Sequence, residues 1–336
     1  MSLDPTPADE SPAGVACIIV NYRAADLVIA RLDQTLGALS RVPQSALFVV
    51  DNASPGDDAA RLRAALEPHE AARLVAHDQN GGFAAGNNVG FEAMRAAEAA
   101  RGRRFAFVFL LNPDAWPEPD AVARLVAFAS EHPATGILGP RIQSEHGTVH
   151  DSAFRFPSVL GEVENRLATG AVTRLLSRAV VSPPAPRAPA RTDWVSGAAM
   201  LIRRALIDEL GPMDEGYFLY FEETDYQRAA ARAGAPIWYV PDAVVTHLEG
   251  ATTGQGKAAA DEAALPDYWF RSRRRYFEKN HGAAYAGIAD AAWLAASRVF
   301  VWRQKILRRP DGGRAAAAER FVANRGKTGR GAPGEA

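Results

Sequence analysis

The chain has 336 residues, of which 48% are hydrophobic and 23% are charged, and its formal net charge is −1 at pH 7. This composition is that of a globular protein, and the length suffices for one large domain with appendages or for two domains. The single cysteine, Cys17, excludes an intrachain disulfide and a cysteine metal cluster, so a reducing compartment is expected. No apolar run reaches the 18 residues that predict a transmembrane helix.

Charge is distributed unevenly along the chain. Residues 268–309 contain ten Lys or Arg against Glu278 and Asp290, whereas residues 15–267 carry a net charge of −8. Residues 1–14 are polar, acidic and proline-rich, which predicts a disordered lead-in and not a secretory signal. An acidic body followed by a basic segment indicates two separate tasks.

The first half of the chain alternates short apolar runs with helical patterns. Apolar runs predict strands at 15–21, 46–52, 73–77, 105–111 and 136–142. Apolar residues at helical spacing predict helices at 24–39, 57–66, 83–100 and 118–131. Because strands and helices alternate with short connections, we expect an α/β fold with a mostly parallel sheet and right-handed crossovers.

The second half is less regular. Residues 144–192 lose both periodicities and end in the proline-rich SPPAPRAPAR, which predicts an irregular, mobile excursion over the sheet. Order returns with a strand at 194–204, a loop entering a helix within 216–234, and strands at 237–240 and 243–247. Residues 311–336 are rich in Gly, Ala and Arg, and this composition predicts disorder.

Residues 268–309 mix arginines with aromatic residues and continue into a helical pattern. One apolar stripe at helical spacing consists of Ile288, Ala292, Ala295, Val299, Trp302 and Ile306. A basic, aromatic helix suits a membrane interface that contains anionic lipid. The alternative is that the stripe packs on the body of the protein or on another subunit.

Polar residues cluster where the predicted strands end. Asp51 ends the second strand, Asp114 follows the fourth in LLNPD, and the glycine-rich DQNGGFAAGNN (78–88) lies between them. Loops at the carboxyl edge of a parallel sheet form ligand crevices, and a helix amino terminus favours an anion. Taken singly, each motif could be a simple turn. Together they resemble a nucleotide site that lacks a Rossmann fingerprint.

A second acidic group lies in GYFLYFEETDY, where Glu222, Glu223 and Asp225 stand among aromatic residues. Acidic residues are favourable in any first helical turn, which is the structural alternative. Carboxylates in aromatic surroundings are also candidates for raised proton affinity and general-base catalysis. His247 ends an apolar strand, and from there it could join Asp114 around a hard divalent cation.

As a set, these motifs resemble family 2 glycosyltransferases with the GT-A fold, especially the bacterial rhamnosyltransferase-like branch. The matching pieces are IIVNY (18–22), VVDNAS (49–54), NGGFAAGNN (80–88), LLNPD (110–114), WVSGAAMLIRR (194–204), YFEETDYQRAAARAG (220–234) and VPDAVVTH (240–247). The resemblance implies a GT-A domain at 15–255 and a basic, aromatic helical extension at 256–310. Residues 1–14 and 311–336 remain as the disordered ends.

The resemblance also implies roles for the acidic residues. Glu223 stands at the position of the family's catalytic base, and Glu222 and Asp225 would position the acceptor or the base. Asp114 and His247 would hold Mg²⁺ or Mn²⁺ on the donor's diphosphate. The implied nucleotide-sugar-binding residues are Asn21, Asp51, Asn80, Gly81, Gly82, Asn87, Asn112, Asp114 and Gly197. Asp51 would bind the nucleotide base, and Asn112 replaces the first aspartate of the family's DxD motif.

The implied activity is inverting, metal-dependent transfer of a sugar, rhamnose from dTDP-rhamnose above others, to a hydroxyl of a glycan or lipid-linked glycan in cell-envelope polysaccharide synthesis. A galactofuranosyl or other hexosyl donor is one alternative, and an inactive nucleotide-sugar-binding protein is another. Nucleic-acid binding through 268–309 is disfavoured by the acidic body. We expect a cytoplasmic protein with peripheral contact at the inner face of the plasma membrane through 268–309; the sequence predicts no oligomeric state.

Overall fold

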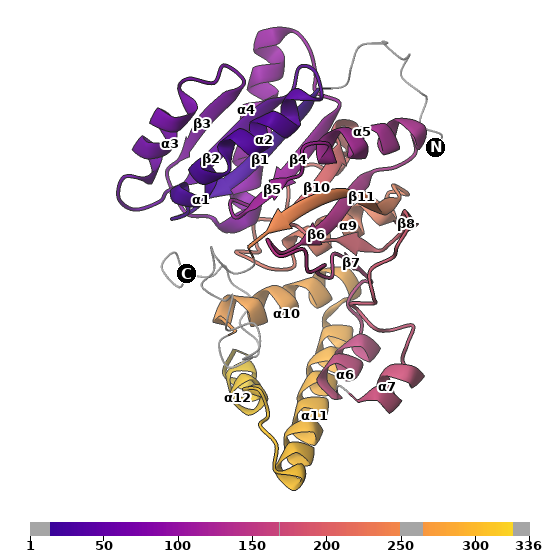
Figure 1. Ribbon diagram of the computed structural model, residues 1–336. Coiled ribbons are helices and arrows are strands. Elements are labelled where there is room, and N and C mark those ends of the chain that lie inside the picture. Colours follow the sequence, from indigo (N-terminus) through magenta and orange to yellow (C-terminus); the bar gives the residue numbers. More distant parts are fainter. Residues whose placement is uncertain (1–13, 168, 249–264, 325–336) are drawn as a thin grey trace.

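The computed structural model describes residues 14–167, 169–248 and 265–324 (Figure 1). Its centre is a nine-stranded sheet of order β3-β2-β1-β4-β10-β6-β11-β5, with β8 paired to β11. These strands are β1 (Val15–Asn21), β2 (Ala46–Asn52), β3 (Ala72–His77), β4 (Phe107–Leu111), β5 (Ala115–Pro117), β6 (Ile137–Gln143), β8 (Ala190–Arg191), β10 (Ala199–Arg203) and β11 (Ile237–His247). Strands β3, β2, β1 and β4 run parallel, as predicted, and the antiparallel β10 separates them from β6.

Helices cover both faces of this sheet. They are α1 (Ala25–Ala30), α2 (Leu32–Ser40), α3 (Asp58–Leu66), α4 (Gly82–Arg101), α5 (Ala121–Glu131), α8 (Arg204–Leu210) and α9 (Glu222–Arg232). The core on one face receives apolar residues from α1, α2, α3 and α5, and the core on the other face receives them from α4, α8 and α9. Because strand side chains alternate, β1 supplies both cores, with Cys17 on one face and Ile18 on the other. Cys17 is fully buried, and burial raises the pKa of its thiol.

Four predicted elements, in three places along the chain, differ in detail from the structure. The helix predicted at 24–39 is interrupted at Arg31, which separates α1 from α2. The strand predicted at 194–204 is divided by a turn into β9 (Trp194–Val195), which pairs with β7 (Ala153–Phe154), and β10. The two strands predicted at 237–247 are one strand, β11, whose register shifts between Val240 and Val244; Pro241, which has no backbone donor, lies within the shift.

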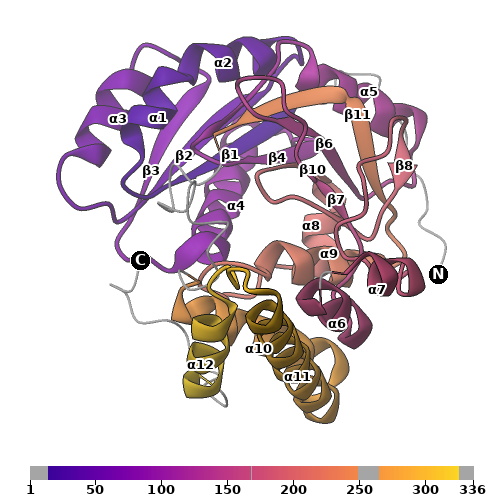
Figure 2. The same cartoon turned by 60° about the horizontal axis from the view of Figure 1, so that its bottom comes forward.

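A helical part projects from the carboxyl edge of the sheet (Figures 1 and 2). It comprises α6 (Val159–Leu167), α7 (Gly170–Leu175), α10 (Asp267–His281), α11 (Ala283–Leu307) and α12 (Arg314–Asn324). The excursion at 144–192 therefore contains two short helices as well as irregular chain. The prediction of disorder for 311–336 is wrong for α12, because Ala317 and Phe321 are buried against Phe270 and Trp293. The predicted boundary at residue 255 lies outside the described residues.

Helix α11 packs through a face other than the predicted stripe. Its inward face is made largely of small residues, including Ala286, Ala289 and Ala296, around the buried Trp293. The large residues of the predicted stripe point outward; Ile288, Trp302 and Ile306 are 59–66% exposed. The stripe therefore does not pack on the described body. Within the described residues, no helix combines the length and apolarity that crossing a membrane requires.

Candidate active site

A pocket of about 240 Å³ opens at the carboxyl ends of β1, β2 and β4, and we call it the sheet-edge pocket. Its lining residues are Val20, Tyr22, Arg23, Asn52, Asn80, Gly82, Phe83, Asn112, Pro113, Phe218, Leu219 and Tyr268. Of the predicted binding residues, Asn80, Gly82 and Asn112 lie in this lining. The strand ends thus border a pocket, as expected, although several lining residues were not predicted.

Asn21 and Asp51 lie beneath the sheet-edge pocket and do not line it. Both are buried, and the Asn21 side-chain amide donates to Asp51 Oδ1 at 2.8 Å and to Ser54 Oγ at 3.1 Å. They fix the turn that follows β2. The neighbouring Asn52, missed by the prediction, lines the pocket and donates to Asn80 Oδ1 at 2.9 Å.

The glycine-rich turn is held against a distant loop. Gly82 has φ +83°, and a Cβ at this position would lie 1.9 Å from the carbonyl oxygen of Phe218. The adjacent Phe83 N–H donates to that same oxygen at 2.9 Å. Gly81 precedes α4 directly, and Asn87 is buried one turn later, where its amide donates to the Phe83 carbonyl. Glycine is required at 82 because both the backbone angle and the close approach exclude a side chain.

The Asn112-Pro113-Asp114 corner is both a turn and part of the site. Ala115 N–H donates to the Asn112 carbonyl at 3.1 Å, which closes the turn. Asp114 is buried at the carboxyl end of β4, and its Oδ1 lies 3.1 Å from Nε2 of His247 at the end of β11. One carboxylate and one imidazole fit a divalent cation that takes its other ligands from substrate phosphates and water. No cluster of three or more His, Cys, Asp or Glu suited to a metal occurs in the described part of the chain.

Two strained residues precede the paired glutamates. Tyr220 and Phe221 have φ of +69° and +70°, a conformation that bulky residues rarely adopt and that often marks a functional site. Helix α9 then begins at Glu222. Burial, followed by the neighbouring charge of Glu223, raises the pKa of Glu222 well above its ordinary value. Burial also raises the pKa of Glu223, while hydrogen bonds from the backbone N–H groups of Glu223 and Thr224, and then from the Glu222 side chain, oppose that rise. The proton affinity of each glutamate therefore depends on the charge of the other.

Glu223 faces a second pocket of about 240 Å³, which we call the aromatic cleft. Its lining residues are Pro157, Gly161, Glu162, Asn165, Arg166, Val181, Trp194, Tyr220, Phe221, Glu223, Thr224, Trp269 and Trp293. Oε2 of Glu223, like Oε2 of Glu222, is buried without a hydrogen-bond partner among the described residues. The Cβ of any residue replacing Gly197 would lie 3.2 Å from Glu223 Cγ, so Gly197 makes room for this glutamate and does not line the sheet-edge pocket.

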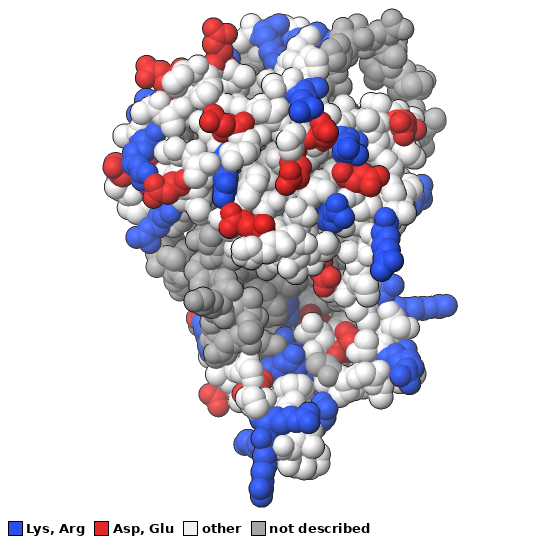
Figure 3. Space-filling view, in the orientation of Figure 1, with Lys and Arg blue, Asp and Glu red and all other residues white. Residues whose placement is uncertain are grey.

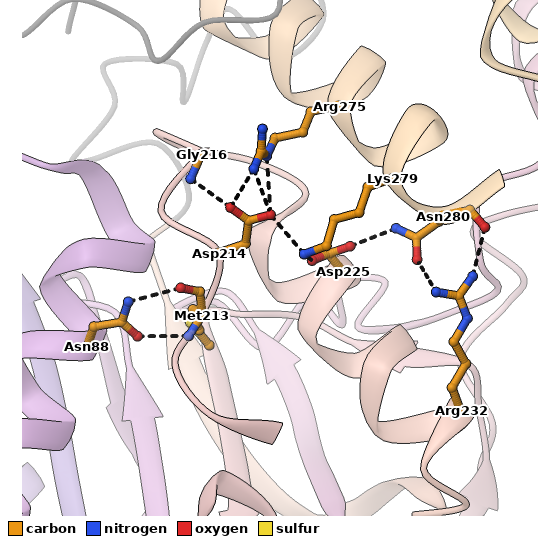
Figure 4. Close-up of polar contacts among 9 residues, drawn as sticks. All are labelled: Asn88, Met213, Asp214, Gly216, Asp225, Arg232, Arg275, Lys279 and Asn280. Carbon is orange, nitrogen blue, oxygen red and sulfur yellow. Dashed lines mark hydrogen bonds and ion pairs between the residues drawn. The ribbon is translucent and has the colours of Figure 1, made fainter. Parts of the chain in front are cut away.

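Asp225 lies away from both pockets. Its carboxylate accepts hydrogen bonds from Lys279 at 2.6 Å and from Asn280 at 2.7 Å, both on α10 (Figure 4). Asp214, in the loop before α9, accepts from Arg275 and from the same Lys279, at 2.8 Å each. We call these five residues the α10 clamp. The structure thus gives Asp225 a role in docking α10 on α9, and it does not bring Asp225 to the paired glutamates' cleft.

The two pockets adjoin along two short segments. Phe218 and Leu219 line the sheet-edge pocket, and the next two residues of that loop line the aromatic cleft. On α10, Tyr268 lines the sheet-edge pocket and the following residue, Trp269, lines the aromatic cleft. A molecule in one pocket would therefore lie beside a molecule in the other, with Glu223 on the side of the aromatic cleft.

The family model described as "Glycosyltransferase like family 2" matches residues 12–262. N-acetylglucosaminyl-diphospho-decaprenol L-rhamnosyltransferase of Mycobacterium tuberculosis (strains CDC 1551 / Oshkosh and H37Rv) is 28% identical over 244 residues, which are 68% of this chain and 75% of the relative.

Solved structures share the fold. A mannosyltransferase from Pyrobaculum calidifontis in complex with GDP-Man and Mn²⁺ superposes with a TM-score of 0.53 at 17% identity, covering 96% of this chain and 90% of that chain. S. aureus TarS 1–349 superposes with a TM-score of 0.50 at 12% identity, covering 93% of this chain and 80% of that chain. The predicted GT-A fold is confirmed.

Proposed function

The chain belongs to glycosyltransferase family 2, and from that premise we propose that it transfers a hexose, with inversion, from a nucleotide sugar in the sheet-edge pocket to an acceptor hydroxyl in the aromatic cleft. The observation that carries this proposal is the position of Glu223, which lines the aromatic cleft just after a loop whose residues Phe218 and Leu219 line the sheet-edge pocket. A base on the acceptor side and a leaving group on the other side are the arrangement that single displacement needs.

Glu223 is the proposed base. It accepts the proton of the acceptor hydroxyl while that oxygen bonds to the anomeric carbon and the bond to the nucleoside diphosphate breaks. A base works best when its pKa is near the working pH, and burial raises the pKa of Glu223 in that direction. Glu222, whose raised pKa favours the protonated form, donates a hydrogen bond to Glu223 and orients it. Gln227 supports this geometry, since its buried amide group joins α9 to both backbone polar groups of Val195.

Asp114 and His247 are the residues that would hold Mg²⁺ or Mn²⁺. A bound divalent cation would neutralise charge on the departing diphosphate. The donor set and the 3.1 Å separation of its two atoms fit that role, and the mannosyltransferase from Pyrobaculum calidifontis is in complex with Mn²⁺ as well as GDP-Man.

Rhamnose from dTDP-rhamnose is the proposed donor, and a lipid-linked N-acetylglucosamine in cell-envelope synthesis is the proposed acceptor. The support is the mycobacterial relatives, whose name specifies L-rhamnosyl transfer to N-acetylglucosaminyl-diphospho-decaprenol. A galactofuranosyl or other hexosyl donor would fit the same fold.

Calorimetric titration of the protein with a panel of nucleotide sugars, first with Mn²⁺ and then with EDTA, tests the donor and the metal together. We expect saturable binding of dTDP-rhamnose that weakens strongly in EDTA. Tight binding of a different donor would overturn the sugar assignment, and equal binding in EDTA would overturn the metal. Binding without any turnover on a lipid-linked acceptor would indicate an inactive nucleotide-sugar-binding protein.

Peripheral membrane contact through 268–309 is also proposed, specifically through the outer face of α11. Trp302 and Ile306 are exposed there beside Lys305 and Arg308, and basic side chains gather at this end of the molecule (Figure 3). Exposed aromatic and aliphatic residues among cations suit an anionic lipid surface.

Flotation with vesicles containing phosphatidylglycerol tests this contact. The double substitution Trp302→Ser and Ile306→Ser removes two large exposed apolar side chains at this end, so we expect about a tenfold loss of lipid-bound protein. Leu175→Ser on α7 is the control, because Leu175 is 83% exposed but lies outside α11. Equal flotation of the double variant and the wild type would exclude this face.

A further inference from the structure

Residues from several separate parts of the chain form the aromatic cleft. Helix α6 supplies Glu162, Asn165 and Arg166, and the strained loop with the start of α9 supplies the residues around Glu223. Helices α10 and α11 supply Trp269 and Trp293. The family match ends at residue 262, so these two tryptophans come from the helical extension beyond it.

Buried ion pairs join the helices α6, α10 and α11 that line the cleft. Arg273 on α10 is fully buried, and it donates to Asp290 on α11 at 2.7 Å and to Glu162 on α6 at 3.2 Å. Arg274 donates to the other oxygen of Asp290 at 2.5 Å. Removing either partner of such a buried pair is costly, so the three helices are fixed around the cleft in the absence of ligand.

The lining of the cleft matches the chemistry of a sugar ring. A pyranose has apolar C–H faces that pack on aromatic rings and equatorial hydroxyls that need hydrogen-bond partners at the edge. Trp194, Trp269 and Phe221 provide aromatic surfaces, whereas Asn165 and Thr224 provide polar groups. Glu223 lines the same space, and its Oε2 is buried without a hydrogen-bond partner among the described residues.

We propose that the aromatic cleft binds the terminal pyranose of the acceptor, and that the helical extension, through Trp269 and the helices it fixes, selects the acceptor. This inference rests on the proposed function. It assigns the extension a second role beside membrane contact: α10 forms one wall of the acceptor site. Acceptor choice then depends on residues after 262, and donor choice depends on the sheet edge.

The test is a titration of intrinsic tryptophan fluorescence with methyl β-N-acetylglucosaminide, a soluble probe of the acceptor sugar. We expect saturable quenching in the wild-type protein and at least a tenfold weaker affinity in Trp269→Ala. Trp302→Ala is the matched control, because Trp302 is 66% exposed and does not line the cleft. Its affinity for the glycoside should equal that of the wild type.

Asn165→Ala guards against loss of folding in Trp269→Ala, because Asn165 lies on the surface of α6 at the cleft. We expect a several-fold weaker affinity for the glycoside and an unchanged melting temperature. Unaltered glycoside binding in both cleft variants would overturn the inference, as would an absence of saturable binding in the wild type. Titration of the same samples with the donor distinguishes failure of this inference from failure of the proposed function. If the donor binds normally and the cleft variants leave the affinity for the glycoside unchanged, only the assignment of the cleft is contradicted.

Discussion

The two pockets of this protein are built in different ways. The sheet-edge pocket is formed largely by turns that directly follow strands, so its residues are positioned by short-range geometry in the parallel sheet. The aromatic cleft is lined mostly by helical side chains from α6, α9, α10 and α11, so it exists only when distant segments have packed. The difference teaches that the aromatic cleft depends more on long-range packing than the sheet-edge pocket does, although both include residues of the 218–221 loop and of α10.

Removing the proposed base should have the largest effect, and it should affect turnover without affecting donor binding. Glu223→Gln keeps the shape of the cleft but cannot accept a proton, so we expect turnover to fall by about 10²- to 10⁴-fold. Donor affinity, measured by calorimetry, should stay within a factor of two or so, because Glu223 does not line the sheet-edge pocket. Retained turnover would place the base elsewhere.

A substitution at Gly82 should instead affect the sheet-edge pocket, which Gly82 lines. Gly82→Ala forces a methyl group toward the Phe218 carbonyl at a left-handed backbone angle, and we expect a loss of roughly 1–3 kcal/mol in unfolding free energy together with weaker donor binding. Gly37→Ala is the matched control, since Gly37 lies inside α2 with open space around it and the change should stabilise by roughly 0.5–1 kcal/mol. Chemical denaturation measures both, and equal behaviour would contradict the tight approach at Gly82.

The α10 clamp attaches α10, which contributes to both pockets, to α9 and to the loop before it. Its contribution to stability can be measured. Burial alone would raise the pKa of Asp214, but hydrogen bonds from Arg275 and Lys279 lower it to about 2. The unfolded carboxyl titrates near 3.8, so the clamp stabilises the protein above that pH, and this stability is lost as pH falls from about 4 to 2.

We therefore expect Asp214→Asn to lower the unfolding free energy at pH 7 by roughly 2 kcal/mol and to flatten its acid dependence. Asp267→Asn is the control, because the Asp267–Arg320 pair is more than a third exposed on both sides and should matter by at most about 1 kcal/mol. Urea unfolding from pH 3 to pH 7 distinguishes them. A pH profile unchanged by Asp214→Asn would mean that the clamp contributes no stability.

The smallest expected effect on stability comes from the proton held by Glu222. The folded state holds the proton of Glu222 at pH values where the unfolded chain has released it, because burial raises the pKa of Glu222. Unfolding free energy should therefore decline as pH rises above the unfolded pKa. Glu222→Gln should reduce that decline and stabilise the protein at pH 8 by roughly 1 kcal/mol. Thermal unfolding at pH 5 and pH 8 measures it, and an equal decline in the variant would assign the pH dependence to other groups.

The sequence was most informative where structure follows from neighbouring residues. Strand ends and glycine turns are local signals, and these marked the segments that contain Asn80, Gly82 and Asn112, which the resemblance to the family then named as binding residues; all three line the sheet-edge pocket. Asp114 and His247 were also paired correctly, since both follow apolar strands whose ends meet at one edge. Asn52 could have been found by the same reasoning, as it adjoins Asp51 in the same turn.

The aromatic cleft and the helical part were harder to predict from the sequence, for a physical reason. The inward face of α11 is chiefly alanine, which packs closely but adds little to a hydrophobic pattern, so the large outward residues determined the predicted stripe. Asp225 stands in an acidic motif, and only the arrival of Lys279 and Asn280 from α10 shows what holds it. Contacts between residues more than fifty positions apart leave no periodic signal.

The burial of Cys17 in β1 has a practical consequence for labelling. A fully buried thiol whose pKa is raised exists almost entirely in the protonated form, which reacts poorly with maleimides. Since this is the only cysteine in the chain, a cysteine introduced at an exposed position would be the single reactive thiol of the folded protein. An environment-sensitive dye on a cysteine at position 302 could then report the approach of α11 to a bilayer. A dye on a cysteine at position 165 could report occupation of the cleft. Cys17 would not have to be replaced in either case.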